Sequence, residues 1–269
     1  MTHYVQFRNE RLTQLGAEID TRTTDGAFAR RSIVEGAAVY TTDRYLDRYG
    51  ETDRRNSPLY DEALAALPAG HQLRYGLAPY QYGSAYVADR VDSPADLPAV
   101  YERPPTTSQQ VIHGLAPDEA APDPLAVTVQ TGGRWREVGT DRLGEAFLRY
   151  ALESHLDPER AASVAAGWGN DSLRIVSERG TTEARYAWVH RWDDADAADA
   201  FTDAMRAYLD ARGDPTDRGW ILPNTDLEVT VMPVSSETTV VLFGGESFLD
   251  ATDTAGTDDD VTVTVGTPD

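Results

Sequence analysis

The spacing of apolar residues changes around residues 114–124, and this change constrains the fold more than any other feature of the sequence. Before this segment, apolar side chains recur every three to four residues, which is the period of an amphipathic helix. After it, several short segments alternate between apolar and polar residues, which is the period of a β-strand. The segment itself is rich in Pro, Asp and Ala, a composition typical of a linker.

These periods predict helices in the first part of the chain and a mixture of helices and strands in the second. The main expected helices are residues 3–16, 27–49, 58–67, a helix that starts at about residue 75 or 79 and ends at residue 90, and residues 141–155, 158–166 and 195–211. The expected strands are residues 125–130, 173–177, 185–191, 227–232 and 239–243. The last four strands are expected to form two antiparallel hairpins. The predicted fold class is therefore α+β, with a mostly helical half followed by an α+β half.

The same patterns predict three regions along the chain. Residues 1–118 are expected to form a helical region, and residues 119–249 an α+β region that packs on it. Residues 250–269 are acidic and rich in Thr, and this composition predicts a disordered tail.

The charge balance excludes one class of partner. Acidic residues number 45 and basic residues 24, all of them Arg, which gives a net charge of -21. Because phosphate binding requires clustered basic side chains, nucleic acid is not an expected partner. Such a composition is similar to that of proteins from salt-loving archaea, in which salt screens the repulsion between surface carboxylates. The chain has no cysteine, so any metal would be held by His, Asp or Glu.

The first residues predict neither a membrane span nor a signal peptide. No run of 18 apolar residues occurs, and the opening Met1-Thr2-His3-Tyr4-Val5 lacks a basic region and an apolar core. Taken literally, the chain is expected to be cytoplasmic. The first predicted helix has only Thr2 as a candidate N-cap, so we expect the chain to begin within a helix.

Glu35 stands out because it lies in a run of small and apolar residues, from residue 30 to residue 40. A buried carboxylate is costly unless a cation or several donors meet it, so a positive group should face Glu35. The small residues that follow, Gly36 to Ala38, would let a second helix approach closely. Candidate partners for Glu35 are His3 and a nearby arginine such as Arg31.

Five separate motifs resemble, in order, those of a family of gluzincin-type zinc-metallopeptidase-like proteins that includes haloarchaeal surface proteins. The resemblance extends over residues 1–192. The motifs are Val34-Glu35-Gly36-Ala37-Ala38, Ala78-Pro79-Tyr80 with Gly83 and Tyr86-Val87, the segment from Pro104 to His113, Leu143-Gly144-Glu145, and the segment from Ala165 to Asp171.

The resemblance implies a zinc site that is incomplete in this chain. Glu35 matches the third zinc ligand, and His3 matches the second His of a His-Glu-x-x-His helix, in which the Glu is the general base. The first His and the base correspond to the two positions immediately before Met1, so this sequence lacks them. Either the gene starts upstream of Met1, or the protein is a truncated relative of the family. With two ligands and no base, we expect weak zinc binding and no hydrolysis. His113 is compatible with an oxyanion or substrate contact and equally with a structural role.

Two functions follow as expectations. The first is a homologue or fragment of a zinc metallopeptidase, acting on a peptide or protein in its complete form, at the cell surface or outside the cell. The second is a non-catalytic surface or interaction protein that retains the fold and binds a partner between its two halves. Trp168, Asn170 and Asp171 are expected to end a helix and start a strand. His71, His155 and His190 match no motif, and the sequence carries no signal of oligomeric state.

Overall fold

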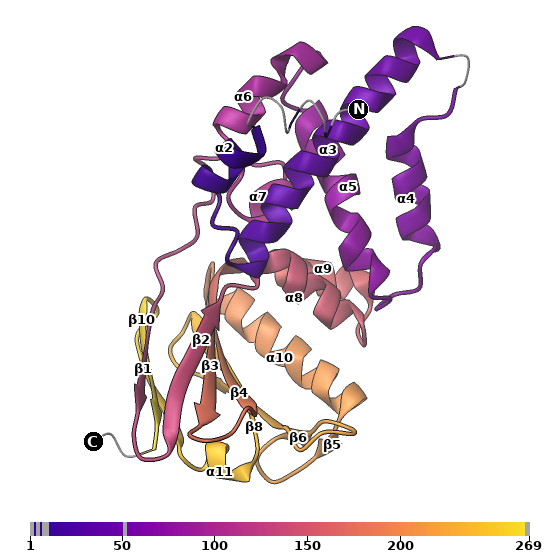
Figure 1. Ribbon diagram of the computed structural model, residues 1–269. Coiled ribbons are helices and arrows are strands. Elements are labelled where there is room, and N and C mark those ends of the chain that lie inside the picture. Colours follow the sequence, from indigo (N-terminus) through magenta and orange to yellow (C-terminus); the bar gives the residue numbers. More distant parts are fainter. Residues whose placement is uncertain (1–2, 4–5, 7–10, 51–52, 267–269) are drawn as a thin grey trace. The chain divides into compact units, whose positions relative to one another are not determined.

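A computed structural model describes residues 3, 6, 11–50 and 53–266 (Figure 1). The chain divides into two compact units. The first, here called the helical unit, comprises residues 1–121 and 144–154. The second, here called the β unit, comprises residues 122–143 and 155–269. The fold class is α+β, with helices in the N-terminal half and antiparallel sheets in the C-terminal half, as the sequence predicts.

The helical unit is built from helices of very different lengths, labelled in Figure 1. Its long elements in the described residues are α3 and α5, and shorter helices pack around them. The elements are α2 (Arg11–Glu18), α3 (Thr24–Tyr49), α4 (Asn56–Ala66), α5 (Leu73–Ala88), a 3₁₀ turn (Pro94–Asp96), α6 (Leu97–Glu102), α7 (Ser108–Ile112) and α8 (Gly144–Glu153).

Helices α3 and α5 lie side by side and point in the same direction. Phe28 meets Tyr75 at one end, with ring centroids 5.5 Å apart, and the Tyr40 hydroxyl donates to the Val91 carbonyl at the other, at 2.9 Å. Between these contacts the two backbones meet at Gly36, where an added Cβ would lie 2.2 Å from the backbone carbon of Gly83. The close approach expected at Gly36 is therefore confirmed, and the approaching helix is α5.

Helix α8 belongs to the helical unit although it follows two strands in the sequence. The buried Asp25 carboxylate accepts hydrogen bonds from the Ser108 amide at 2.7 Å and from its hydroxyl at 2.6 Å. That hydroxyl in turn accepts from the Ala146 amide at 3.1 Å, so the first turns of α3, α7 and α8 meet at one point. The continuous α+β region expected from residue 119 to residue 249 is thus interrupted by residues 144–154. The reason is that this helix buries its apolar face against α3 and α5.

The large sheet of the β unit has seven strands in the order β2-β3-β4-β8-β7-β6-β5. Both expected hairpins are confirmed, because β3 pairs antiparallel with β4, and β7 pairs antiparallel with β8. The strands are β2 (Trp135–Asp141), β3 (Trp168–Glu178), β4 (Ala184–Trp192), β5 (Asp214–Pro215), β6 (Trp220–Ile221), β7 (Glu228–Pro233) and β8 (Thr238–Gly244).

The expectation of a disordered tail is wrong for residues 250–266. This segment contains β9 (Thr252–Gly256) and β10 (Asp260–Val265), and β10 pairs in parallel with β1 (Ala126–Thr131) to give a three-stranded sheet. Within β10, Val261, Val263 and Val265 are fully buried and alternate with Thr. This alternation provides an apolar face that the acidic composition of the tail obscures.

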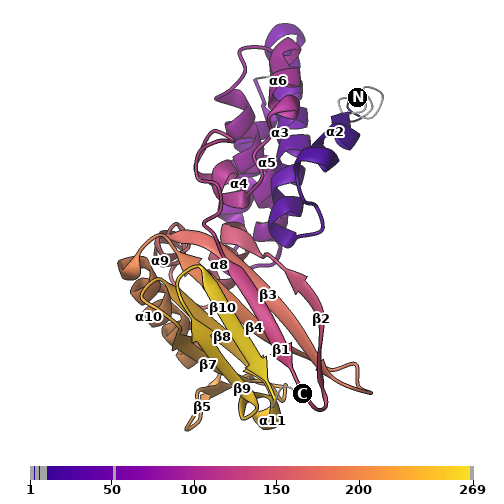
Figure 2. The same cartoon turned by 90° about the vertical axis from the view of Figure 1, so that its left-hand side faces the viewer.

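The β unit has three layers, which can be followed in Figures 1 and 2. One face of the large sheet packs against the small sheet, since Val189 and Val240 share a core cluster with Val261 and Val263. The other face is covered by α10 (Ala195–Arg212), whose Phe201 contacts His190 of β4. Two further helices complete the unit, α9 (Pro158–Ala165) and α11 (Glu246–Leu249). No helix within the described parts of the chain is sufficiently long and apolar to cross a membrane.

We expect salt to stabilise the protein, because its net charge is -21. Repulsion between surface carboxylates weakens as the screening length falls from about 10 Å at 0.1 M salt to about 3 Å at 1 M. The urea midpoint of unfolding should therefore rise steadily between 0.1 M and 2 M KCl. Tryptophan fluorescence can measure this midpoint for the β unit, which contains all five tryptophans. A midpoint that stays constant over this range would contradict the expectation.

Candidate functional site

The two sequence-predicted metal ligands lie next to each other in the helical unit. His3 Nε2 is 3.4 Å from Glu35 Oε2, and the His3 side chain is 57% exposed while that of Glu35 is 20% exposed. Glu35 is carried by the middle of α3, which is held in place by its packing on α5. A carboxylate and an imidazole therefore meet at a partly open surface, an arrangement able to share a cation.

Gln6 supports this pair from the protein interior. Its side chain is 3% exposed, and its Oε1 lies 2.8 Å from His3 Nδ1. Its Nε2 donates to the Val34 carbonyl at 3.0 Å and to the Tyr101 hydroxyl at 2.9 Å. One buried amide thus connects the imidazole to the turn of α3 that precedes Glu35. No motif in the sequence marks Gln6 as a site residue, although it lies three residues after His3.

Two stacked tyrosines lie close enough to Glu35 for its charge to act on one of them. Tyr60 of α4 stacks on Tyr80 of α5, with ring centroids 4.5 Å apart and an angle of 18° between the planes. The Arg31 guanidinium lies 5.6 Å from the centre of the Tyr80 ring. Burial raises the pKa of Tyr60, and Tyr80 and the negative charge of Glu35 raise it further. Tyr80 belongs to the second motif of the resemblance, so two of the motifs meet near this site.

The pair has no third ligand among the residues that the structure describes. Within these residues no group of three or more His, Asp or Glu side chains is placed to hold a metal ion. Catalytic zinc usually has three protein ligands and an open position for water. The donor types at His3 and Glu35 suit zinc, but two donors are one short of a catalytic centre.

His113, the third candidate, is paired with an acidic residue. Its Nε2 donates to both carboxylate oxygens of Glu145, at 2.9 and 3.0 Å. Glu145 is completely buried, whereas the His113 side chain is 37% exposed. Because a buried carboxylate requires a charged or donating partner, this contact accounts for His113 as a connection between α7 and α8. The motifs from Pro104 to His113 and from Leu143 to Glu145 therefore meet in space.

The last motif also has a structural explanation. As expected, α9 ends and β3 begins at this point, with Trp168 as the first residue of the strand. The Asp171 carboxylate is 3% exposed and accepts from the indole nitrogens of Trp168 and Trp188 and from the Leu143 amide, each at 2.9 Å. The sequence predicted the strand entry, but it did not predict that this carboxylate would be buried among three donors.

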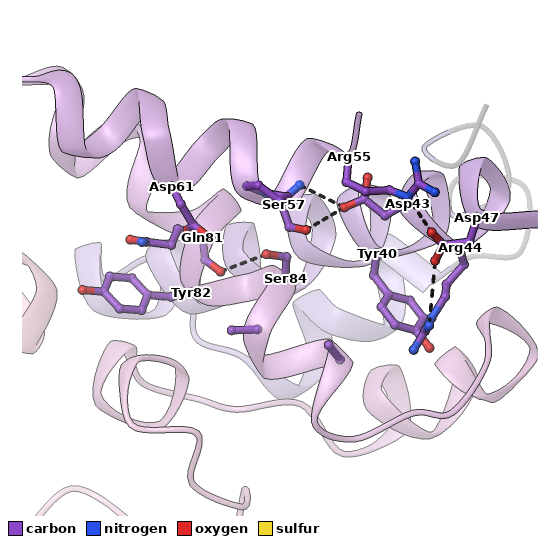
Figure 3. Close-up of a pocket in the computed structure, with 13 residues that line it drawn as sticks. Tyr40, Asp43, Arg44, Asp47, Arg55, Ser57, Asp61, Gln81, Tyr82 and Ser84 are labelled. Carbon is purple, nitrogen blue, oxygen red and sulfur yellow. Dashed lines mark hydrogen bonds and ion pairs between the residues drawn. The ribbon is translucent and has the colours of Figure 1, made fainter. Parts of the chain in front are cut away.

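A groove lies between α3, α4 and α5 (Figure 3). Its volume is about 540 Å³. One wall is held by Asp43, which accepts from the Asn56 and Ser57 amides at 2.6 and 2.9 Å and so caps α4. One turn further along α3, Asp47 pairs with Arg55 at 2.5 Å. Its lining thus combines the tyrosines Tyr40 and Tyr82 with paired charged groups such as Asp47 and Arg55.

Comparisons with known proteins identify one family. Neither the curated proteins nor the solved structures contain a match to the chain. The model of a family described as a domain of unknown function, DUF8575, matches residues 130–265, just over half of the 269 residues. The matched residues cover most of the β unit and also α8 of the helical unit. The chain therefore belongs to the DUF8575 family.

Proposed function

We propose that the chain is a zinc-metallopeptidase-like protein whose helical unit provides His3 and Glu35 as two metal donors. The observation that carries this proposal is the distance of 3.4 Å between His3 Nε2 and Glu35 Oε2. In a tetrahedral site with donors about 2.0–2.1 Å from the metal, two ligand atoms lie about 3.3–3.4 Å apart. The distance therefore suits two ligands of one zinc ion, and both residues also match ligand positions in the resemblance.

In this proposal the described site binds zinc weakly and does not hydrolyse peptides. Zinc, when bound, would act as a Lewis acid toward water or a carbonyl group, but that chemistry also requires a third ligand and a general base. By the same resemblance, we assign the complete form to the cell surface or the extracellular space, with a peptide or protein as substrate.

Zinc titration of the untagged protein tests the proposal. We expect calorimetry to show one weak zinc site. Glu35→Gln should lower its zinc affinity at least tenfold, because loss of an outer-shell partner already costs about tenfold and Glu35 is a direct ligand in this proposal. Glu62→Gln is the matched control, because Glu62 is an exposed residue of α4 in the same unit. Equal zinc binding by the native protein and the Glu35→Gln variant would overturn the assignment. Peptidase activity of this chain that is lost on Glu35→Gln would also contradict it.

The second candidate function is a non-catalytic surface or interaction protein that keeps the peptidase-like fold. The observation that favours it is the groove of about 540 Å³ between α3, α4 and α5, which lies within the volume range typical of ligand sites. If the native protein does not bind zinc, this second function is favoured over the first.

A further inference from the structure

The geometry points to Gln6 as a positioning residue that holds the His3 imidazole with its Nε2 lone pair facing Glu35. This inference deepens the proposed function, on which its metal-binding consequence rests. The orientation of the ring, however, follows from hydrogen bonds alone and does not depend on a metal.

The hydrogen bonds of the Gln6 amide determine which of its two ends is the nitrogen. The group that faces the Val34 carbonyl lies 3.0 Å from it. A backbone carbonyl can only accept a hydrogen bond, so this end of the amide must be the NH₂ group. The second acceptor of the same NH₂ group is the Tyr101 hydroxyl at 2.9 Å, in a position where Tyr101 is 4% exposed. The other end of the amide is therefore the Oε1 oxygen.

The orientation of the Gln6 amide determines in turn which nitrogen of the His3 imidazole carries the proton. Gln6 Oε1 can only accept, and it lies 2.8 Å from His3 Nδ1, so Nδ1 must carry a proton. In the neutral ring Nε2 is then the unprotonated nitrogen, which is the form that ligates a metal. This atom faces Glu35 Oε2 at 3.4 Å. Metal-ligating histidines commonly donate their other ring N–H to a fixed acceptor in this way.

Gln6 is more deeply buried than the His3 imidazole that it supports. Gln6 is 3% exposed, whereas the His3 side chain is 57% exposed. The Val34 carbonyl belongs to the residue directly before Glu35, so the same amide orients the imidazole relative to the turn that carries the carboxylate. Loss of Gln6 would therefore release the ring and also its alignment with Glu35.

Nitrogen NMR of the histidine rings tests this directly in the metal-free full chain. At pH 8.5 we expect the neutral His3 ring to carry its proton at Nδ1, because Nδ1 faces the Gln6 Oε1 acceptor. The His3 signals are assigned by their loss in His3→Gln. Gln6→Leu should shift the ring toward the other tautomer or toward a mixture, while Gln72→Leu, a change at an exposed glutamine of the same unit, should leave it unchanged. An unchanged His3 tautomer in folded Gln6→Leu would overturn the inference.

Zinc affinity separates this inference from the proposed function. If His3 and Glu35 hold zinc, Gln6→Leu should weaken binding about 10–100-fold, the usual effect of losing an outer-shell partner. Tyr101→Phe removes one acceptor of the Gln6 amide and keeps the buried ring, so it should weaken zinc binding less than Gln6→Leu does. Tyr101→Phe replaces Gln6→Leu in this test if Gln6→Leu does not fold. A native protein that holds the Nδ1 tautomer but binds no zinc would overturn the proposed function and leave the role of Gln6 supported. If the native protein does bind zinc, an unchanged affinity in folded Gln6→Leu would overturn that role.

Discussion

Replacement of Asp171 by alanine should lower the free energy of unfolding of the β unit by about 3–5 kcal/mol, the cost typical of breaking a buried charged network. The carboxylate is 3% exposed and holds the indoles of Trp168 and Trp188 and the amide of Leu143. Its loss would leave three donors without this acceptor in a region where water does not compensate them. A loss of this size is a large fraction of the stability of a typical domain.

Tryptophan fluorescence is a selective probe for this experiment. All five tryptophans lie in the β unit, at positions 135, 168, 188, 192 and 220. Urea unfolding followed by fluorescence therefore reports this unit separately from the helical unit. Asp171→Asn should lie between the native protein and Asp171→Ala, because the amide keeps one acceptor but places a donor against another donor.

Asp199→Ala is the matched control for Asp171. Asp199 is exposed on α10 of the same unit, and such surface substitutions usually change stability by less than about 0.5 kcal/mol. Equal unfolding midpoints for Asp171→Ala and Asp199→Ala would show that the network contributes little to the stability of the β unit.

The second large effect is a dependence of stability on pH that arises from His190. Its ring is completely buried and lies 4.1, 4.6 and 5.3 Å from the rings of Trp188, Phe201 and Trp192. Neither ring nitrogen has a hydrogen-bond partner among the described residues. Asp171 lies opposite His190 in the register of β3 and β4, and its oxygens accept from the indoles and the Leu143 amide. Burial lowers the pKa of His190 to about 3 from the usual 6.5.

The direction of the effect follows from proton binding. Below pH 6.5 the unfolded chain protonates His190, whereas the folded protein keeps the ring neutral down to about pH 3. Unfolding therefore takes up a proton in this window, and the stability present above pH 6.5 falls as the pH decreases. The contribution is about 2 kcal/mol between pH 7 and pH 5 and on the order of 5 kcal/mol by pH 3.

His190→Leu tests this effect. Urea unfolding of the native protein at pH 7 and pH 5 should differ by about 2 kcal/mol more than unfolding of the variant does. The comparison at pH 5 avoids most of the titration of Asp and Glu. His155→Gln, a change at an exposed histidine of the same unit, should keep the native pH dependence. Parallel pH dependence in His190→Leu and the native protein would contradict the buried neutral state of His190.

The parts of the structure that local periodicity encodes were predictable. The helix around Glu35 and both hairpins follow from spacing within a single segment, so no distant contact is needed to recognise them. The position of His3 next to Glu35 was also predicted. That prediction did not come from local spacing; it came from the resemblance and from the need of a partly buried carboxylate for a partner.

Other features depend on which distant segments meet. Gln6 and Asp171 are ordinary polar residues in the sequence, and their roles exist only because Val34, Tyr101, Trp188 and Leu143 supply partners. Position in the folded protein also decides the state of His190, since burial among aromatic rings is what lowers its pKa.

The sequence by itself determined the α+β class, the main helices within the described residues, the two hairpins and the absence of cysteine chemistry, because these depend on composition and on short-range spacing. Most of the helix expected at residues 3–16 lies outside the described residues. Only the tertiary structure decided that α8 joins the helical unit and that the acidic tail completes a sheet with β1. The physical reason is that a helix or strand is stabilised by the apolar surface it buries, and the segment that covers that surface can lie anywhere in the chain.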